Sequence, residues 1–242
     1  MINILMPIAG RSAFFDNAEY HYPKPLIEIK GKTMIERAIH DYKKIRGEKR
    51  FIFVVNANDC DKYHMDNVLM LLTDGQCEII RLEKETRGAA CSALMAIDFI
   101  DSEDRLIIGN SDQIFDEDLN AVLKFFEKKK ADGGVICFET VHPRWSYVRL
   151  DEGKRIIEAA EKRPISTKAI AGFYYFRQGA FFVDAAMRSI EKDASVDGAY
   201  YIAPVFNELV LQSKILEVYD IGQEKYHTFY SPQKIEEFEK KS

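Results

Sequence analysis

Residues 1–39 read MINILMPIAGRSAFFDNAEYHYPKPLIEIKGKTMIERAI, and this stretch decides the fold class. Residues 2–8 form an apolar run that ends at Ala9-Gly10, a pattern typical of a buried strand followed by a turn. Thr33 precedes Glu36 in a capping-box pattern, and apolar side chains then recur at helical spacing. A buried strand followed by an amphipathic helix is the repeating unit of an α/β protein.

The same alternation continues through the first half of the chain. It predicts buried strands at 51–55, 78–82, 105–108 and 134–138, and helices at 89–97 and 118–129. Strands that are apolar on both faces and alternate with helices indicate a mostly parallel sheet in a three-layer α/β fold. Ligands of such sheets bind at the carboxyl ends of the strands, so we expect the site near residues 9–14, 83–88 and 109–113.

The second half has a different pattern. Short strands are expected at 147–150, 155–159 and 169–176, and they form a small β insertion that could close over a site. The remaining predictions are helices at 179–191, 204–212 and 233–241 and a strand at 215–219. No repeat or linker separates the two halves, so the sequence predicts a single domain over residues 1–242.

Composition narrows the choice of partners. The chain has 34 Lys and Arg residues against 39 Asp and Glu residues, and this acidic balance argues against a nucleic-acid partner. Neither a signal peptide nor an apolar run long enough to span a membrane is found, so we expect a cytoplasmic protein without a membrane partner. The sequence is compatible with a homo-oligomer.

Two short loops contain residues suited to phosphate chemistry. Gly10 ends the first strand, where backbone N–H groups can approach an anion. Lys24 lies between Pro23 and Pro25, which restrict the backbone and are expected to make a helix impossible there. A lysine on a stiff loop beside a phosphate site could neutralise transferring phosphoryl oxygens, whereas a solvated surface lysine is the alternative.

The order of several motifs makes the chain similar to the sugar nucleotidyltransferase family, also called nucleotide-sugar pyrophosphorylases. The resemblance covers residues 1–180 well and the rest loosely, and it rests on the opening 6–39, Thr86-Arg87-Gly88-Ala89-Ala90, Gly109-Asn110-Ser111-Asp112-Gln113, Glu161-Lys162-Arg163-Pro164 and Ala171-Gly172-Phe173-Tyr174. It implies a Rossmann-like fold of the GT-A type and a Mg²⁺-dependent enzyme. The reaction implied joins a nucleoside triphosphate to a phosphorylated acceptor and releases pyrophosphate.

The resemblance also assigns roles to positions of this sequence. Lys24 looks like the family's phosphate-binding lysine, and Asp112 resembles its Mg²⁺-binding aspartate. A carboxylate is a suitable ligand for that hard cation. The catalytic residues implied are Lys24, Arg11 and Asp112. The nucleotide-binding residues implied are Ala9, Gly10, Arg11, Ser12, Lys24, Glu83, Gly88 and Ser111.

An acceptor site is implied as well. Glu161 and Lys162 look like the pair that holds the acceptor, with Lys162 on its phosphate, and Gly172 belongs to the same group. A surface ion pair is the alternative interpretation of Glu161 and Lys162. Tyr147 follows Ser146 where the family has Tyr-Gly, and its ring would crowd a hexose pocket.

Two departures from the family pattern bear on the nucleotide. After Gly10-Arg11 the family's second glycine and its triphosphate-binding arginine are missing, and Arg11, Lys84 and Arg87 are the candidates to replace that arginine. Thr228 stands where longer members have a second metal-binding aspartate. Asp197, Asp220 and His227 are the other candidates for that metal ligand, and the sequence does not choose among them.

Glu83 bears on the choice of base. Thymidylyl members have a glutamine at this position, five residues before Gly88, whereas an ionised carboxylate can only accept hydrogen bonds. The amino group of cytosine is a donor at the corresponding edge, so Glu83 favours CTP. The form Trp145-Ser146-Tyr147-Val148, with Gly88-Ala89-Ala90-Cys91 and Asn110-Ser111-Asp112-Gln113, resembles small members of capsule and surface-polysaccharide gene clusters, among them a cytidylyltransferase that acts on phosphoglutamine. The acceptor expected is phosphoglutamine or a sugar phosphate.

Parts of the sequence also suit other functions. The closest alternative is a hexose-1-phosphate thymidylyl- or uridylyltransferase of the same family. A GT-A glycosyltransferase would require an Asp-x-Asp motif, but this sequence has Ser111-Asp112-Gln113. The missing glycine and arginine of the loop would also suit a catalytically weakened nucleotide-binding relative.

Overall fold

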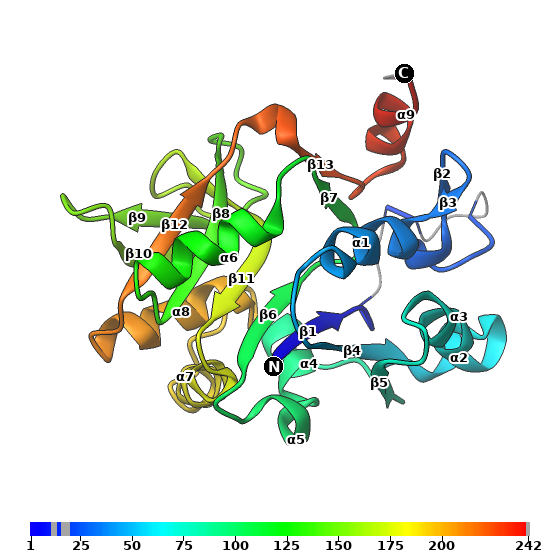
Figure 1. The fold of residues 1–242 in the computed structure, drawn as a ribbon, viewed down its shortest axis with the longest axis horizontal. Coiled ribbons are helices and arrows are strands. Elements are labelled where there is room, and N and C mark those ends of the chain that lie inside the picture. Colours follow the sequence, from blue (N-terminus) through cyan, green and yellow to red (C-terminus); the bar gives the residue numbers. More distant parts are fainter. Residues whose placement is uncertain (11–13, 16–19, 241–242) are drawn as a thin grey trace.

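The computed structural model describes residues 1–10, 14–15 and 20–240, and its central feature is a nine-stranded sheet (Figure 1). The principal strand order is β10-β9-β11-β6-β1-β4-β5, and β8 pairs with both β11 and β12. The strands are β1 (Ile2–Pro7), β4 (Lys49–Asn56), β5 (Cys77–Leu82), β6 (Arg105–Gly109), β8 (Gly133–Glu139), β9 (Tyr147–Leu150), β10 (Ile156–Ala160), β11 (Lys168–Phe176) and β12 (Leu216–Asp220).

The strands β1, β4, β5 and β6, which come first in the chain among the strands of this sheet, pair in parallel. β1 lies between β4 and β6 and is parallel to both, and β5 continues the parallel arrangement beside β4. β11 joins the sheet antiparallel to β6 and β8. The expected mostly parallel α/β fold is therefore confirmed.

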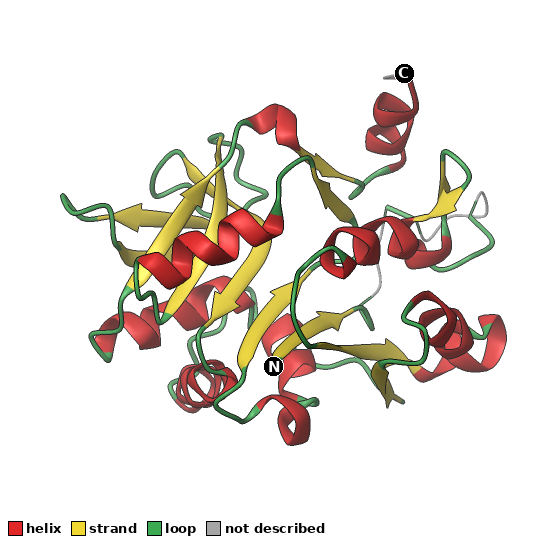
Figure 2. Cartoon of the chain, in the orientation of Figure 1, coloured by secondary structure: helices red, strands yellow, loops and turns green. Residues whose placement is uncertain are grey.

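Helices cover both faces of this sheet and make it the middle of three layers (Figure 2). Successive side chains of β1 enter different cores, because Leu5 packs on one face while Ile4 and Met6 pack on the other. The helices are α1 (Met34–Lys43), α2 (Ala57–Tyr63), α3 (Met65–Leu72), α4 (Ala89–Leu94), α5 (Ile97–Ile100), α6 (Leu119–Lys128), α7 (Gly179–Glu191), α8 (Ile202–Leu211) and α9 (Pro232–Lys240). Apolar residues of α4, α7 and α8 lie in the first core, and those of α1, α3 and α6 lie in the second.

The helix predicted to start at Thr33 does so. The Thr33 side-chain oxygen accepts a hydrogen bond from the Glu36 backbone N–H at 3.3 Å, which satisfies one of the free donors of the first turn. The helices α2 and α3 had no counterpart in the predictions, because α2 is a short polar segment and the apolar residues of α3 fill only two turns. Asn56 caps α2, and His64, in the left-handed conformation, separates it from α3.

The prediction that no helix forms at Lys24 was wrong. Lys24–Leu26 make one turn of 3₁₀ helix, η1, with Pro23 as its N-cap. Pro25 is tolerated there because the first turn of a helix has backbone N–H groups with no helical partner, so the missing N–H of proline costs nothing. The Leu26 N–H closes the turn on the Pro23 carbonyl at 2.8 Å.

The β insertion expected in the second half is an extension of the main sheet. β9 and β10 form an antiparallel hairpin, and Ala169 of β11 pairs with Tyr147 of β9. Two small sheets complete the fold: β2 (Glu28–Ile29) with β3 (Lys32–Thr33), and β7 (Gln113–Phe115) with β13 (Tyr226–Thr228), which follows the 3₁₀ turn η2 (Gln223–Lys225). None of the helices in the described ranges is long and apolar enough to cross a membrane.

Candidate functional site

Lys24 and Asp112 meet at the carboxyl end of the parallel strands. Asp112 lies in the turn between β6 and β7, and its carboxylate forms an ion pair with the Lys24 ammonium group. The two side chains are 18% and 20% exposed, so the pair is largely shielded but still reachable from solvent. The Lys24 ammonium also lies 5.6 Å from the centre of the Phe15 ring. The structure thus brings together the cation and the acidic residue that the sequence singled out.

A cleft of about 240 Å³ opens beside Lys24. Ala9 and Gly10 line it where β1 ends, and residues 20–25 line another wall. Side chains at the end of β4 and in the helix after it complete the cleft, namely those of Asn56, Asn58, Asp59 and Tyr63. Arg11 and Ser12, which the resemblance placed at the nucleotide, lie outside the described residues. The cleft occupies the position where an α/β sheet binds its ligand, past the carboxyl ends of adjacent strands.

The backbone conformation and the close packing at position 88 both require a glycine. It has φ of +110° at the start of α4, and a Cβ there would lie 2.4 Å from the Tyr200 carbonyl oxygen. That carbonyl accepts a hydrogen bond from the Ala90 N–H at 3.0 Å, so the turn packs directly against backbone. Of the candidate replacements for the missing loop arginine, Arg87 donates to the Gly198 carbonyl at 3.3 Å and lies over the Tyr200 ring.

The other predicted nucleotide residues occupy loop positions. Glu83 is exposed directly after β5, and Ser111 is partly exposed in the turn that carries Asp112. Their positions at strand ends agree with the expected edge of the sheet. Whether they contact a nucleotide stays a prediction.

Thr228 lies next to Asp112, as its place in the sequence pattern suggested. In the β7–β13 ladder Thr228 is opposite Gln113, and the Phe229 N–H donates to the Asp112 carbonyl at 2.8 Å. The other three candidates for a second metal ligand are engaged elsewhere. Asp197 pairs with Lys162 at 3.7 Å, Asp220 with Lys168 at 3.0 Å, and His227 with Asp116 at 2.8 Å.

The residues near Asp112 are compatible with Mg²⁺. The described part of the chain contains no cluster of three or more His, Cys, Asp or Glu side chains that could hold a metal. Mg²⁺ does not need such a cluster, since it commonly binds through one or two carboxylates together with substrate phosphates and water. A reachable Asp112 carboxylate with a threonine hydroxyl on the adjacent strand matches that donor chemistry.

Glu161 and Lys162 line a second pocket, of about 640 Å³, between β10 and the segment before α8. The Ser146 hydroxyl donates to the Glu161 carboxylate, and burial raises the pKa of that carboxyl group. The Lys162 ammonium donates to the Tyr201 hydroxyl at 2.9 Å, and this hydrogen bond raises the lysine pKa. Both groups face a space large enough for a small phosphorylated molecule.

Tyr147 does not face either pocket. Its ring is fully buried in the core that contains α1 and α6, and its hydroxyl donates to the His142 carbonyl at 2.6 Å. Because side chains alternate along β9, the preceding Ser146 is the residue turned toward Glu161. The expectation that Tyr147 crowds an acceptor pocket is therefore corrected, and Ser146 is the position that sequence reasoning passed over.

Gly172 supports the turn that carries Asp112. It has φ of +64°, and a Cβ there would lie 2.3 Å from Gln113 Oε1 and 2.4 Å from Asn110 Nδ2. The Gln113 amide donates to the Gly172 carbonyl at 2.8 Å and accepts from the Tyr226 hydroxyl at 3.1 Å. Gly172 thus allows β11 to pack against the turn that carries Asp112, which is a structural reason for a glycine here.

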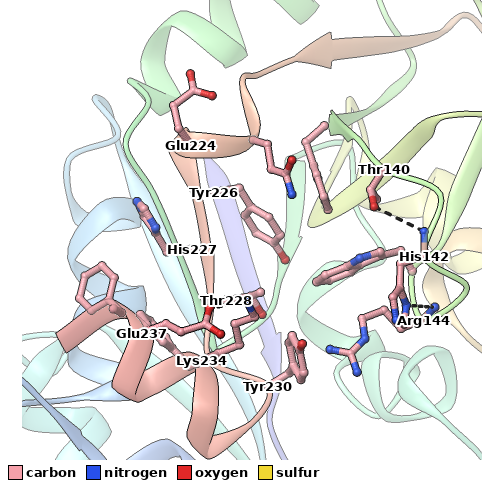
Figure 3. A pocket seen from close by; sticks show the side chains of 15 residues that line it. Thr140, His142, Arg144, Glu224, Tyr226, His227, Thr228, Tyr230, Lys234 and Glu237 are labelled. Carbon is pink, nitrogen blue, oxygen red and sulfur yellow. Dashed lines mark hydrogen bonds and ion pairs between the residues drawn. The ribbon is translucent and has the colours of Figure 1, made fainter. Parts of the chain in front are cut away.

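A third pocket, of about 600 Å³, lies between the β8–β9 loop and the C-terminal segment (Figure 3). Arg144 and Trp145 line it from the loop, while Thr228 and Tyr230 line it from the other side. The Arg144 guanidinium lies over the Tyr230 ring, 3.6 Å from its centre. Sequence reasoning did not single out Arg144, because a lone arginine in a loop carries no motif.

The chain belongs to the nucleotidyl transferase family, whose sequence model matches residues 20–222. Over 162 residues it is 30% identical to the bifunctional protein GlmU of Methanocaldococcus jannaschii; the match covers 66% of this chain and 36% of that protein, so the chain spans about a third of the length of this curated relative.

Solved structures share the fold across the whole chain. A nucleoside-diphosphate-sugar pyrophosphorylase from Vibrio cholerae RC9 superposes with a TM-score of 0.83 at 23% identity and full coverage of both chains. The inositol-1-phosphate CTP transferase of T. maritima superposes with a TM-score of 0.75 at 16% identity, covering 96% of this chain and 90% of that one. The Rossmann-like fold expected from the motifs is therefore confirmed.

Proposed function

We propose that this chain transfers a nucleotidyl group from a nucleoside triphosphate to a phosphorylated small acceptor and releases pyrophosphate. The observation that carries the proposal is the meeting of Lys24 with Asp112 beside the cleft at the carboxyl ends of the strands. A fixed cation and a reachable carboxylate are the two groups that in-line transfer of a phosphoryl centre needs.

The chemistry follows from the charges that have to be balanced. An oxygen of the acceptor phosphate forms a bond to the α-phosphorus while the bond to the pyrophosphate oxygen breaks. The Lys24 ammonium neutralises charge on the transferring phosphoryl group, and Lys162 holds the acceptor phosphate in line. No covalent intermediate with the protein is required.

We propose Asp112 as the Mg²⁺ ligand. In the structure this carboxylate pairs with Lys24, so binding of a cation would release the lysine toward the phosphates. When bound, Mg²⁺ supplies charge neutralisation on the phosphate oxygens. Thr228, at the position of the family's second aspartate, would offer a hydroxyl in place of that carboxylate.

CTP is the nucleotide we favour. Glu83 is exposed after β5, where its carboxylate can accept from the cytosine amino group but cannot donate to the O4 of uracil or thymine. Rates of pyrophosphate release should be higher with CTP than with UTP or dTTP, and Glu83→Gln should reduce that preference. Glu103→Gln, at an exposed position before β6, is the matched control. A preference of about tenfold or more for dTTP or UTP would contradict this assignment.

The acceptor we propose is phosphoglutamine or a sugar phosphate, used in the synthesis of capsule or surface-polysaccharide precursors. A screen of pyrophosphate release tests this directly by crossing CTP, UTP, dTTP and GTP with sugar 1-phosphates, phosphocholine and phosphoglutamine. Release with one pair supports the transferase and names its substrates. Nucleotide binding without release in any combination would instead favour a catalytically weakened relative.

A further inference from the structure

Two of the three nitrogen atoms of the half-buried Arg144 side chain are buried without a hydrogen-bond acceptor among the described residues. Its Nε and Nη1 groups are covered by protein, and neither has a partner within the part of the chain that the structure describes. Leaving a buried donor unsatisfied costs about 1–3 kcal/mol, and more when the group is charged. Such a group in a native fold calls for a ligand or a functional explanation.

The loop that carries Arg144 is held in place by its own hydrogen bonds. The Arg144 N–H donates to His142 Nδ1 at 3.3 Å, and the Tyr147 hydroxyl donates to the His142 carbonyl at 2.6 Å. The guanidinium stacks on the Tyr230 ring, as Figure 3 shows, a contact that orients its plane. The cation is therefore positioned in advance of any binding event.

The same loop is connected to the pair that we assign to the acceptor. The Lys162 N–H donates to the Trp145 carbonyl at 3.1 Å, and the Ser146 hydroxyl donates to Glu161. On its other side, Tyr230 is two residues beyond Thr228 and one beyond Phe229, whose N–H donates to the Asp112 carbonyl. Residues adjacent in the chain to Arg144 and to Tyr230 therefore contact the Glu161–Lys162 loop and the turn that carries Asp112.

The charges of the surrounding pocket do not compensate Arg144. Glu224 and Glu237 also line it, but Figure 3 places both on the far side of Tyr226 and Thr228 from Arg144, and Glu237 pairs with Lys234 at 2.5 Å. The pocket measures about 600 Å³, which can hold part of a small molecule.

We propose that Arg144 binds a carboxylate that the acceptor carries in addition to its phosphate. Arginine pairs with carboxylates through two parallel N–H···O bonds, from Nη2 together with either Nε or Nη1, so a bound carboxylate would satisfy one of the two buried donors. Because both donors are covered in this structure, the carboxylate reaches them when a neighbouring ring, such as that of Tyr230, shifts. This inference rests on the proposed function, in which Lys162 holds the acceptor phosphate, and it narrows the acceptor to phosphorylated carboxylic acids.

Two probes that differ in one group test this proposal. 3-Phosphoglycerate and glycerol 3-phosphate share a phosphate and a hydroxylated carbon chain, and only the former has a carboxylate. Isothermal titration of the full chain should show the carboxylate probe binding at least about tenfold more tightly. Arg144→Gln should abolish that preference while leaving the affinity for glycerol 3-phosphate unchanged.

Two further variants complete the design. Arg149→Gln removes an exposed arginine of β9 that pairs with Glu158, and it should keep the preference. Arg144→Lys retains the charge without the planar guanidinium group, so it should keep only part of the preference for the carboxylate probe. This variant also tests the proposal if Arg144→Gln fails to fold. Equal binding of the two probes by the unmodified chain, binding of neither, or a preference that survives in both Arg144 variants would overturn the proposal.

This experiment is separate from the test of transferase activity. Absence of pyrophosphate release would count against the proposed function but would not alter the relative affinities of the two probes. Conversely, a chain that releases pyrophosphate and shows no carboxylate preference would keep the proposed function and lose this inference.

Discussion

The ammonium group of Lys24 forms an ion pair with the carboxylate of Asp112, although 88 positions separate the two residues in the sequence. The pair is possible because η1 directs Lys24 toward the turn after β6, where Asp112 lies. An ion pair that solvent still reaches adds little to stability, so we expect the value of this pair to lie in the reaction.

Replacement of Lys24 should affect turnover far more than folding. Lys24→Ala removes the cation that we assign to the phosphoryl oxygens, and pyrophosphate release should fall by about two orders of magnitude or more. The thermal unfolding midpoint should change little, because the side chain is partly exposed and outside the cores. Lys32→Ala, which removes an exposed lysine of β3, is the control. A near-normal rate would remove Lys24 from the mechanism.

Asp112→Asn should abolish the stimulation by Mg²⁺. The amide keeps the size of the side chain but loses the charge that a hard cation requires. Titration of MgCl₂ against the rate of pyrophosphate release measures the effect. Asp116→Asn changes an exposed carboxylate a few residues further on, and its titration curve should match that of the unmodified chain. An unchanged Mg²⁺ dependence in Asp112→Asn would show that the metal binds elsewhere.

Lys162→Ala should act mainly on the acceptor. Loss of an ammonium group that holds a phosphate should raise the KM for the acceptor by about tenfold or more and leave the KM for the triphosphate nearly unchanged. Lys124→Ala, at an exposed position of α6, should change neither value. An effect confined to the triphosphate would contradict the assignment of the second pocket.

Glu161 should make the stability of the chain depend on pH. Burial raises the pKa of this carboxyl group, so the folded state binds a proton more readily than the unfolded state does. The free energy of unfolding should therefore fall as the pH rises from the ordinary carboxyl pKa through the raised one. Glu161→Gln keeps an acceptor for the Ser146 hydroxyl and removes this loss.

Urea unfolding over a pH series, from about 4 to 8, measures the difference between the two chains. Glu161→Gln should gain stability over the unmodified chain as the pH increases, whereas Glu152→Gln, in an exposed turn, should run parallel to it. Parallel curves for Glu161→Gln would mean that this carboxyl group is not perturbed.

Periodicity in the sequence predicted most of the central sheet, because strands buried on both faces leave unmistakable apolar runs such as residues 2–8. Local sequence patterns predicted less well the short helices and turns whose conformation depends on tertiary contacts or on backbone geometry. Asn56 caps the start of α2, and the left-handed conformation of His64 ends α2 and precedes α3, a break that no apolar period marks in the sequence. The 3₁₀ turn at Lys24 formed in spite of two prolines, because the first turn of a helix needs no N–H from Pro25.

The sequence predicted those residues of the candidate site that belong to a recognisable motif. Lys24 and Asp112 were named from the sequence, and the structure brings them together. Tyr147 was misplaced because the resemblance gave its position in the motif but not the side of the strand on which it lies. Arg144 could not be found in this way, since its significance depends on an unsatisfied guanidinium and on Tyr230, which is distant in the sequence.

The central claim is that Lys24 and Asp112 act on the same bound triphosphate, and a double-mutant cycle tests it most directly. Single-turnover rates of pyrophosphate release would be compared for the unmodified chain, Lys24→Gln, Asp112→Asn and the double variant. Residues that act as a unit lose less together than the product of their separate losses. We predict that the double variant is about as slow as the slower single variant. A loss equal to the product of the two would contradict the account.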